Sequence, residues 1–207
     1  LKRGLKDSVL KHYYGYKFSN PQPLVNAILG RLILPFTKRW TGTRKYPQPI
    51  DGGVILDVGC GNGHMLTEYK RLNWKTYGSE VGDESAKLAQ EAGHQVFVGE
   101  LLDANYPNNF FDVVTLWDSL EHIHNPLESL SDIYRIIKPN GKIYISVPNY
   151  GSWYARLFKD QWFMFTAPLH YYHYTDKTLS NLLAKSGFKD VSIEHPLGDT
   201  GFAQTIA

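Results

Sequence analysis

Hydrophobic residues recur along the chain in short runs that alternate with longer stretches of helical spacing. The run at residues 54–58 ends at glycines, which is typical of a buried parallel strand. The same reading predicts further strands at residues 75–80, 95–98, 111–117, 142–147 and 191–194. It predicts helices at residues 63–72, 84–92, 126–137 and 175–185, with Asp83 as a cap, Pro126 in a first turn and Gly187 as a helix end.

Repeated strand–helix–strand units predict an α/β fold, a doubly wound and mostly parallel Rossmann-like sheet with helices on both faces. Ligands of such sheets bind at the carboxyl ends of the strands. We therefore expect the chemistry directly after five residues that end strands, namely Val58, Glu80, Val98, Trp117 and Val147.

A glycine loop follows the first predicted strand, with the sequence Asp57-Val-Gly59-Cys-Gly61-Asn-Gly63. Glycines allow a tight turn and let a ligand approach the backbone, and the following helix N-terminus suits an anionic group. Glu80 ends the next strand, where an acidic side chain can accept hydrogen bonds from both hydroxyls of a ribose. A nicotinamide-binding loop would space its glycines as G-x-G-x-x-G, but His64 stands at the third position, which disfavours an oxidoreductase.

The G-x-G-x-G spacing, with Asp57 two residues before Gly59, resembles motif I of the class I S-adenosylmethionine-dependent methyltransferases. The resemblance implies the fold of that family, S-adenosyl-L-methionine as cofactor, and a loop that holds its methionine part. It implies that Glu80 holds the ribose, and a sheet that ends in an antiparallel strand, for which residues 201–207 are the candidate. The cofactor-binding residues expected from it are Asp57, Gly59, Cys60, Gly61, Glu80, Glu100 and Leu101 beside the adenine, and Trp117.

Cys60 itself permits two interpretations. A catalytic thiol would need a base and an electropositive setting, and nothing in the sequence specifies either. We therefore expect a small packing residue between the two cofactor glycines rather than a nucleophile.

Residues 111–122, with Asn125-Pro126 after them, are similar to a small-molecule branch of the family that includes the ubiquinone-biosynthesis O-methyltransferases. Val147-Pro-Asn149, Pro168-x-His170 and Gly187-Phe188 extend this resemblance. It implies a small-molecule acceptor that is methylated at oxygen. That this acceptor is apolar or lipid-linked is a separate hypothesis, suggested by the aromatic cluster and the N-terminal amphipathic stretch described below. Nucleic acid is not expected as a partner, because no D/N-P-P-Y/F motif follows the fourth strand. The alternative is a module that binds S-adenosylmethionine without catalysis.

A hydroxyl acceptor must lose a proton, and histidine is the natural base near neutral pH. His122 and His170 are the predicted catalytic residues, with His173 as a further candidate. His122 could equally be a structural histidine bonded to a loop carbonyl. Asp118-x-x-Glu121-His122 also invites comparison with a metal motif of the ubiquinone branch, but Asp118 is shorter than the usual glutamate and Glu121 could cap or face solvent. We expect no metal.

Aromatic residues concentrate between the fifth strand and the following helix, at Trp153, Tyr154, Phe158, Trp162, Phe163 and Phe165. The cluster could line an apolar acceptor pocket, or it could form a satellite core under a long loop. The satellite core is the commoner arrangement.

The remaining features set broad limits. The net charge of +2 is too small to predict a nucleic-acid binder, and the single cysteine fits a reducing compartment. No run is long and apolar enough to cross a bilayer, so we expect a cytoplasmic protein. Residues 1–50 are expected to form a helical lid or extension and residues 51–207 the cofactor-binding domain; the amphipathic stretch at 24–36 suits a lid better than a membrane contact.

Overall fold

The computed structural model describes residues 46–195 and 202–206 of the chain. The predicted lid at residues 1–50 lies outside the described residues except for 46–50, which contain no helix. In the part that is described, no helix is long and apolar enough to span a membrane.

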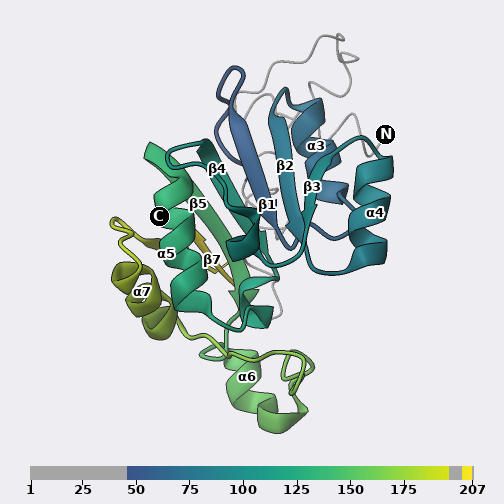
Figure 1. Ribbon diagram of the computed structural model, residues 1–207. Coiled ribbons are helices and arrows are strands. Elements are labelled where there is room, and N and C mark those ends of the chain that lie inside the picture. The colour runs from purple at the N-terminus through teal and green to yellow at the C-terminus, as the bar shows by residue number, and fades with distance from the viewer. Residues whose placement is uncertain (1–45, 196–201, 207) are drawn as a thin grey trace, which may run out of the picture.

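Seven strands form one sheet with the order β3-β2-β1-β4-β5-β7-β6 (Figure 1). The first five pair in parallel, and β7 pairs antiparallel with both β5 and β6. Strand order reverses between β1 and β4, which places the switch point of the sheet at their carboxyl ends. The strands are β1 (Val54–Val58), β2 (Lys75–Glu80), β3 (Gln95–Val98), β4 (Phe111–Trp117), β5 (Ile137–Pro148), β6 (Ser192–Glu194) and β7 (Phe202–Ile206).

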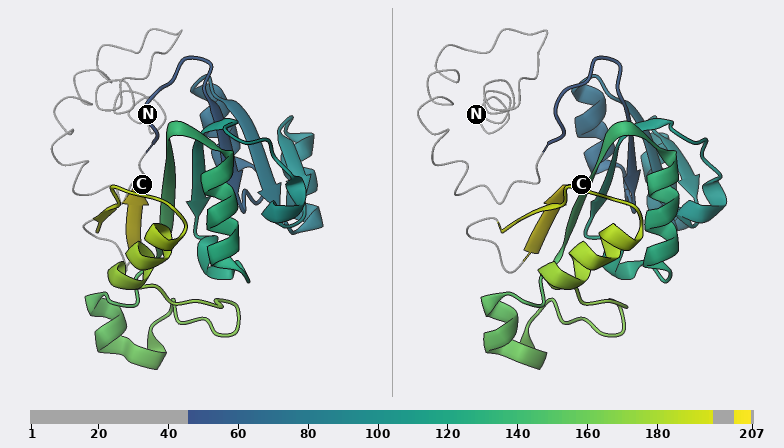
Figure 2. Two further views of the ribbon diagram at one scale, coloured as in Figure 1. Left: turned by 60° about the vertical axis from the view of Figure 1, so that its left-hand side comes forward. Right: turned by 90° about the vertical axis from the view of Figure 1, so that its left-hand side faces the viewer.

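Helices cover both faces of this sheet (Figure 2). They are α3 (His64–Arg71), α4 (Asp83–Glu91), α5 (Pro126–Ile136) and α7 (Asp176–Lys185). A further helix, α6 (Trp153–Phe158), lies apart from the sheet, and 3₁₀ turns are present at η1 (Leu101–Ala104), η2 (Leu120–His122) and η3 (Lys159–Gln161). The predicted α/β fold and its antiparallel seventh strand are confirmed.

Two buried clusters hold the layers together, one on each face of the sheet. Alternate residues of a strand point to opposite faces, so Leu56 packs in one cluster and Ile55 in the other. The larger cluster joins the sheet to α5 and α7 through residues such as Leu130 and Leu183, which are fully buried. The smaller one joins it to α3 through Tyr69.

Two local predictions need correction. Asp83 does not cap a helix: it is the first residue of α4, the cap position is Gly82, and no side chain bonds the free amides there. Strand β5 begins at Ile137, earlier than predicted, because Ile137 already pairs with Phe111. The pairing of β5 with β4 shifts register between Phe111 and Val113, and within β5 Asn140 adopts a left-handed φ of 65°.

The caps of α7 agree with the sequence. Thr175 caps the helix: its hydroxyl accepts from the Thr178 amide, and the Thr178 hydroxyl accepts from the Thr175 amide in return. Gly187 follows the helix with a φ of 101°, the left-handed conformation common after helix ends.

Candidate functional site

The glycine loop between β1 and α3 has the geometry of a ligand cradle. Gly59, Gly61 and Gly63 have φ values of 70°, 53° and 78°, which side chains disfavour. The amides of Gly59 and Cys60 both donate to the Ser79 carbonyl, at 2.8 and 3.1 Å, and thereby fix the loop against β2.

The first two glycines have different surroundings. A Cβ on Gly59 would lie 2.7 Å from the Cβ of Ser119, so a side chain there is excluded by the segment that follows β4. A Cβ on Gly61 would meet nothing within 4 Å. The backbone at Gly61 therefore borders open space that a ligand can enter.

Glu80 ends β2 and faces this loop. One carboxylate oxygen accepts from the Gly61 amide at 2.8 Å, and the other accepts from the Gly82 amide at 2.9 Å. A carboxylate oxygen can accept more than one hydrogen bond, so both oxygens retain capacity for ribose hydroxyls. The residues present thus fit the S-adenosylmethionine that the sequence pattern implies.

Asp57 lies behind the loop and is only 3% exposed. The Thr115 hydroxyl of β4 donates to its carboxylate. This negative charge, after burial itself, helps to raise the pKa of the neighbouring Tyr69 hydroxyl.

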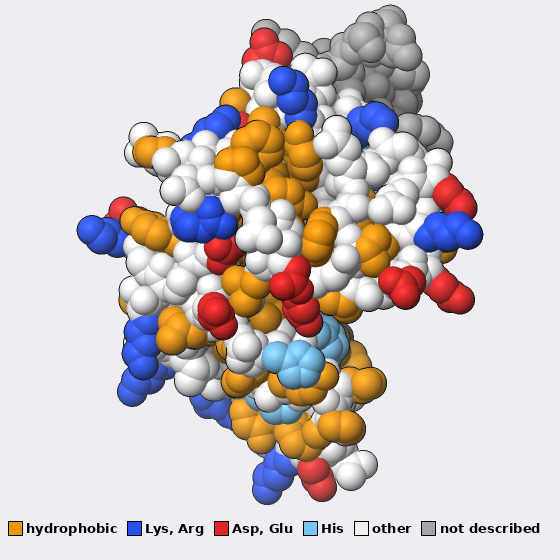
Figure 3. Space-filling model, in the orientation of Figure 1, with side chains coloured by type: hydrophobic (Ala, Val, Ile, Leu, Met, Phe, Trp, Pro, Cys, Tyr) orange, Lys and Arg blue, Asp and Glu red, His pale blue; other side chains and the backbone are white. Residues whose placement is uncertain are grey.

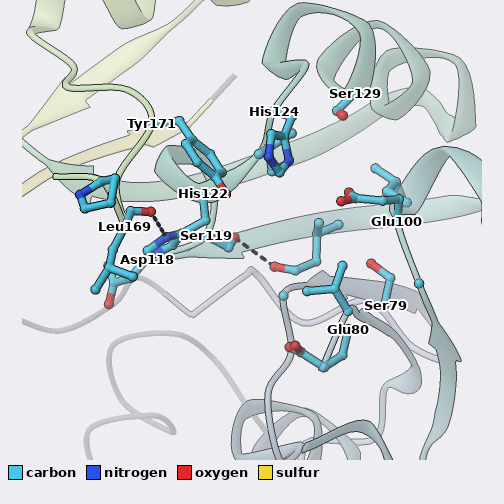
Figure 4. A pocket seen from close by; sticks show the side chains of 17 residues that line it. Ser79, Glu80, Glu100, Asp118, Ser119, His122, His124, Ser129, Leu169 and Tyr171 are labelled. Atoms are coloured by element: carbon cyan, nitrogen blue, oxygen red, sulfur yellow. Dashed lines mark hydrogen bonds between the residues drawn. The ribbon is translucent and has the colours of Figure 1, made fainter. Parts of the chain in front are cut away.

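A cavity of about 640 Å³ opens where β1, β2, β3 and β4 end (Figure 4). Of the predicted site residues, Gly59, Glu80, Glu100, Leu101 and His122 line it. Glu80 and Glu100 lie toward one side, and Asp118, His122 and Leu169 toward the other (Figure 4). One cavity therefore joins the predicted ribose and adenine residues to a predicted base.

Other predicted residues lie behind its lining. Trp117 is buried on the α3 face of the sheet, where its indole N–H donates to the Tyr69 hydroxyl at 2.8 Å. Cys60 is buried, and burial, followed by the charges of Asp57 and Glu80, raises the pKa of its thiol to about 12. Such a thiol stays protonated at neutral pH and would be a poor nucleophile. This agrees with the expectation that Cys60 is a packing residue.

His122 is held by a hydrogen bond that defines its tautomer. Its Nδ1 lies 2.9 Å from the carbonyl oxygen of Leu169. Because a carbonyl can only accept, Nδ1 carries the proton, and Nε2 of the neutral ring holds a free lone pair. The loop-carbonyl bond considered from the sequence is present, and it leaves the ring able to act as a base.

His170 packs edge-on against His122, with ring centroids 4.7 Å apart. Burial first, and then the neighbouring His122, lowers the pKa of His170. Its Nδ1 is buried without a hydrogen-bond partner. His173, farther along the loop, also has a pKa lowered by burial.

Glu121 neither caps a helix nor faces solvent, since it is 1% exposed. Burial is the main reason that its pKa is raised to about 8, so its carboxyl group is largely protonated at neutral pH. Potential ligand atoms of Glu121, His122 and His170 lie within 4.8 Å of one another, so the three side chains could hold a cation. This arrangement does not test the expectation that no metal is used.

Sequence reasoning missed several residues that line the cavity, among them Ser79, Ser119, His124 and Tyr171. Ser119 and Ser79 could have been found, because they stand at or beside the carboxyl ends of predicted strands. Tyr171 stands beside the predicted His170, but the segment that carries it has no periodic pattern that would show which of its side chains face the cavity. Its amide donates to the Glu121 carbonyl at 2.9 Å, and its ring packs on His124 with centroids 4.2 Å apart.

The aromatic residues at 153–165 form neither a closed pocket nor a satellite core. Trp162 is buried at 2% exposure, but Trp153, Tyr154, Phe158, Phe163 and Phe165 are exposed. Helix α6 and the loop after it extend from the sheet as a separate lobe (Figures 1 and 2).

Comparison with known proteins identifies the family of the chain. The model of a methyltransferase domain family matches residues 31–193. The chain is 34% identical over 126 residues to a ubiquinone biosynthesis O-methyltransferase of Pseudomonas putida, and 30% identical over 125 residues to that of Thiobacillus denitrificans. Each alignment covers 56% of this chain and 52% of the relative, so the chain spans about half the length of the curated relatives it matches.

Solved structures share the fold. A methyltransferase of Archaeoglobus fulgidus that depends on S-adenosylmethionine matches with a TM-score of 0.63 at 20% identity, over 87% of this chain and 92% of that one. One from Mesorhizobium loti matches with a TM-score of 0.60 at 17% identity, over 78% and 92%. By the family match, the glycine loop with Glu80, and this fold, the chain belongs to the family of S-adenosylmethionine-dependent methyltransferases.

Proposed function

We propose that the protein transfers the methyl group of S-adenosylmethionine to a hydroxyl oxygen of a small-molecule acceptor. The observation that carries this proposal is the single cavity that joins Glu80 and Glu100 to the imidazole of His122. The likeness to O-methyltransferases of ubiquinone biosynthesis supports oxygen as the accepting atom.

In this proposal the donor side of the cavity holds the cofactor. Glu80 accepts hydrogen bonds from the ribose, the backbone at Gly59 and Gly61 accommodates the methionine part, and Glu100 and Leu101 flank the adenine. Asp57, Cys60 and Trp117 support the loop from behind. When bound, S-adenosylmethionine supplies a methyl group that its sulfonium has already activated.

The acceptor side removes a proton. His122 Nε2 accepts the hydroxyl proton as the oxygen becomes a nucleophile, while the Leu169 carbonyl holds Nδ1–H and fixes the ring. His170 packs against that ring, and its lowered pKa keeps it neutral, so it adds no positive charge beside the proton acceptor. Alignment of the acceptor with the methyl group contributes the larger part of the rate enhancement, on the order of 7–11 kcal/mol of barrier lowering.

Residues 1–50 complete the proposal as a lid over the cofactor and acceptor. The acceptor is proposed to be small, and apolar or lipid-linked, rather than a nucleic acid.

Transfer of a labelled methyl group tests the function. Wild-type protein is incubated with labelled S-adenosylmethionine and a small-molecule extract, and methylated products are identified by mass spectrometry. We expect a methylated hydroxyl compound with the wild type and a loss of roughly 10²–10⁴-fold in rate with His122→Asn. Binding of S-adenosylhomocysteine without transfer to any compound would favour the non-catalytic module instead.

A further inference from the structure

Helix α6 presents an apolar face to solvent. Its four large apolar side chains are Trp153, Tyr154, Leu157 and Phe158, and they are 67%, 40%, 53% and 47% exposed. At about 100° per residue these positions span a face roughly 140° wide. A helix that merely connects two elements would bury such a face or make it polar.

The exposure is not a consequence of an unfolded lobe. The Ser152 hydroxyl caps α6 by accepting from the Ala155 amide at 3.1 Å, and Ala155 and Trp162 anchor the lobe as buried residues. At the other end, the Tyr150 amide donates to the Tyr174 carbonyl at 2.7 Å and closes the base of the lobe. The lobe is thus held in a defined shape that directs its apolar face outward.

The apolar surface continues along the loop that returns to the sheet. Phe163, Leu169 and Tyr171 are 60%, 69% and 50% exposed. Figure 3 shows hydrophobic side chains gathered over the lower lobe, directly beneath histidines. Leu169 and Tyr171 also line the cavity, so the apolar surface reaches the mouth of the site beside His122 and His124.

Basic residues flank this surface. Arg156 and Lys159 are exposed, and within residues 150–174 the only acidic residue is Asp160. On the helix, Arg156 lies about 60° from Trp153, at the edge of the apolar face. Trp and Tyr side chains, with apolar groups that can enter the acyl boundary and cations beside them, suit the interface of an anionic bilayer.

We propose that α6 and the loop after it dock the protein on an anionic lipid surface. A lipid accounts for the continuity with the cavity better than a protein partner does, because a rigid partner on this face would cover the mouth of the site. The proposal of lipid docking depends only on the exposed apolar and basic residues described above. The further idea that an amphiphilic acceptor passes from the bilayer into the cavity rests on the proposed function.

Vesicle co-sedimentation tests the proposal. The probes are vesicles of phosphatidylcholine alone and of phosphatidylcholine with phosphatidylglycerol. We expect the full chain to sediment with the anionic vesicles. The triple variant Trp153→Ser/Leu157→Ser/Phe158→Ser is expected to lose at least tenfold in partition, since its side chains are exposed and no core contact is removed.

Two further proteins make the result specific. Leu88→Ser/Leu127→Ser removes leucines that are 54% and 46% exposed on other helices, and its partition should match the wild type. Arg156→Gln/Lys159→Gln leaves the apolar face intact, and it should bind anionic vesicles more weakly and with a smaller salt dependence. Circular dichroism confirms that each variant is folded.

The proposal is overturned if the wild type ignores both kinds of vesicle, or if the triple variant binds them as well as the wild type does. Wild-type self-association that the triple variant abolishes, without vesicle binding, would assign the face to a second copy and also overturn it. Titration with S-adenosylhomocysteine separates the two claims: failure of that binding defeats the proposed function and leaves lipid docking unaffected.

Discussion

The carboxylate of Glu80 accepts a hydrogen bond from the amide of Gly61 at 2.8 Å, across the gap between the end of β2 and the glycine loop. A residue placed by the sequence as a ribose ligand thus also holds the loop that borders the cavity. The second oxygen accepts from the amide of Gly82 at the start of α4, so one side chain links the glycine loop, the end of β2 and the start of α4. Cofactor affinity and loop order should therefore depend together on Glu80.

Replacement of Glu80 by alanine should weaken S-adenosylhomocysteine binding by tenfold or more. The variant loses the ribose acceptor and leaves the amides of Gly61 and Gly82 without their partner. Calorimetric titration measures the effect. Glu84→Ala is the matched control, since Glu84 is an exposed residue of the neighbouring α4, and its affinity should stay within about twofold of wild type. If the wild type, Glu80→Ala and Glu84→Ala bind S-adenosylhomocysteine with equal affinity, Glu80 is not part of the cofactor site.

Alanine at Gly59 and at Gly61 should have different effects. Gly59→Ala combines left-handed strain of about 1–2 kcal/mol with overpacking of about 1–3 kcal/mol against Ser119, so we expect a loss of stability of roughly 2–5 kcal/mol. Gly61→Ala meets no atom and should cost only the strain of about 1–2 kcal/mol, yet its methyl group occupies ligand space.

Urea unfolding and cofactor titration of both variants separate these effects. We expect Gly59→Ala to be the less stable protein and Gly61→Ala to be folded with weakened cofactor binding. Unimpaired binding by Gly61→Ala would show that the cofactor does not approach the loop there.

The sequence was sufficient to predict the sheet and the loop, because local signals determine both. The apolar run that ends at Gly59 and the acidic residue at the end of the next strand identify the switch point without any knowledge of packing. The start of β5 could not be predicted, because pairing of Ile137 with Phe111 is a contact between distant residues. Propensity alone extends α5 over Ile137.

The main property that the sequence pattern did not predict was which side chains after β4 and β5 are buried. Glu121 follows a strand in a polar stretch and gives no sign that it becomes 1% exposed. Conversely, Trp153 and Phe158 are residues that most sequences bury, yet here they face solvent. In both cases the outcome depends on how the segment after β5 returns to the sheet, which no periodicity specifies.

The base assigned to His122 should show in the rate of methyl transfer. Because Nε2 accepts the hydroxyl proton, His122→Asn should lower the rate by roughly 10²–10⁴-fold while S-adenosylhomocysteine binding stays within about twofold. His124→Asn, a change at a neighbouring lining residue, is the control and should retain the wild-type rate. A rate that is unchanged in His122→Asn would exclude this histidine as the base.

Glu121 should make the protein less stable as the pH rises. Its folded pKa of about 8 exceeds the ordinary 4.5, so the folded state binds more protons than the unfolded state between these values. Its favourable contribution is complete below pH 4.5 and is lost as the pH rises to 8. Glu121→Gln mimics the protonated carboxyl group and should flatten the dependence. Urea unfolding from pH 5 to 8 in the presence of EDTA measures it, and parallel curves for the two proteins would contradict the assignment.

His94 should act in the opposite direction. It is buried at 7% exposure beside the glycine loop, where its Nε2 lies 2.9 Å from the Thr67 hydroxyl, and that hydroxyl donates to the Gly63 carbonyl. Nε2 therefore donates to Thr67, and burial, followed by the charge of Lys70, lowers the pKa of the ring. The unfolded state then binds more protons than the folded state below pH 6.5. The contribution of His94 to stability is therefore complete above pH 6.5 and is lost as the pH falls toward the pKa of the folded state.

His94→Gln can keep a donor to Thr67 but cannot titrate, so its stability should fall less than that of the wild type between pH 6.5 and 5. His64→Gln, at an exposed histidine of the same helix layer, should follow the wild-type curve. If His94→Gln and wild type lose stability equally over this range, the ring is not held neutral beside the loop.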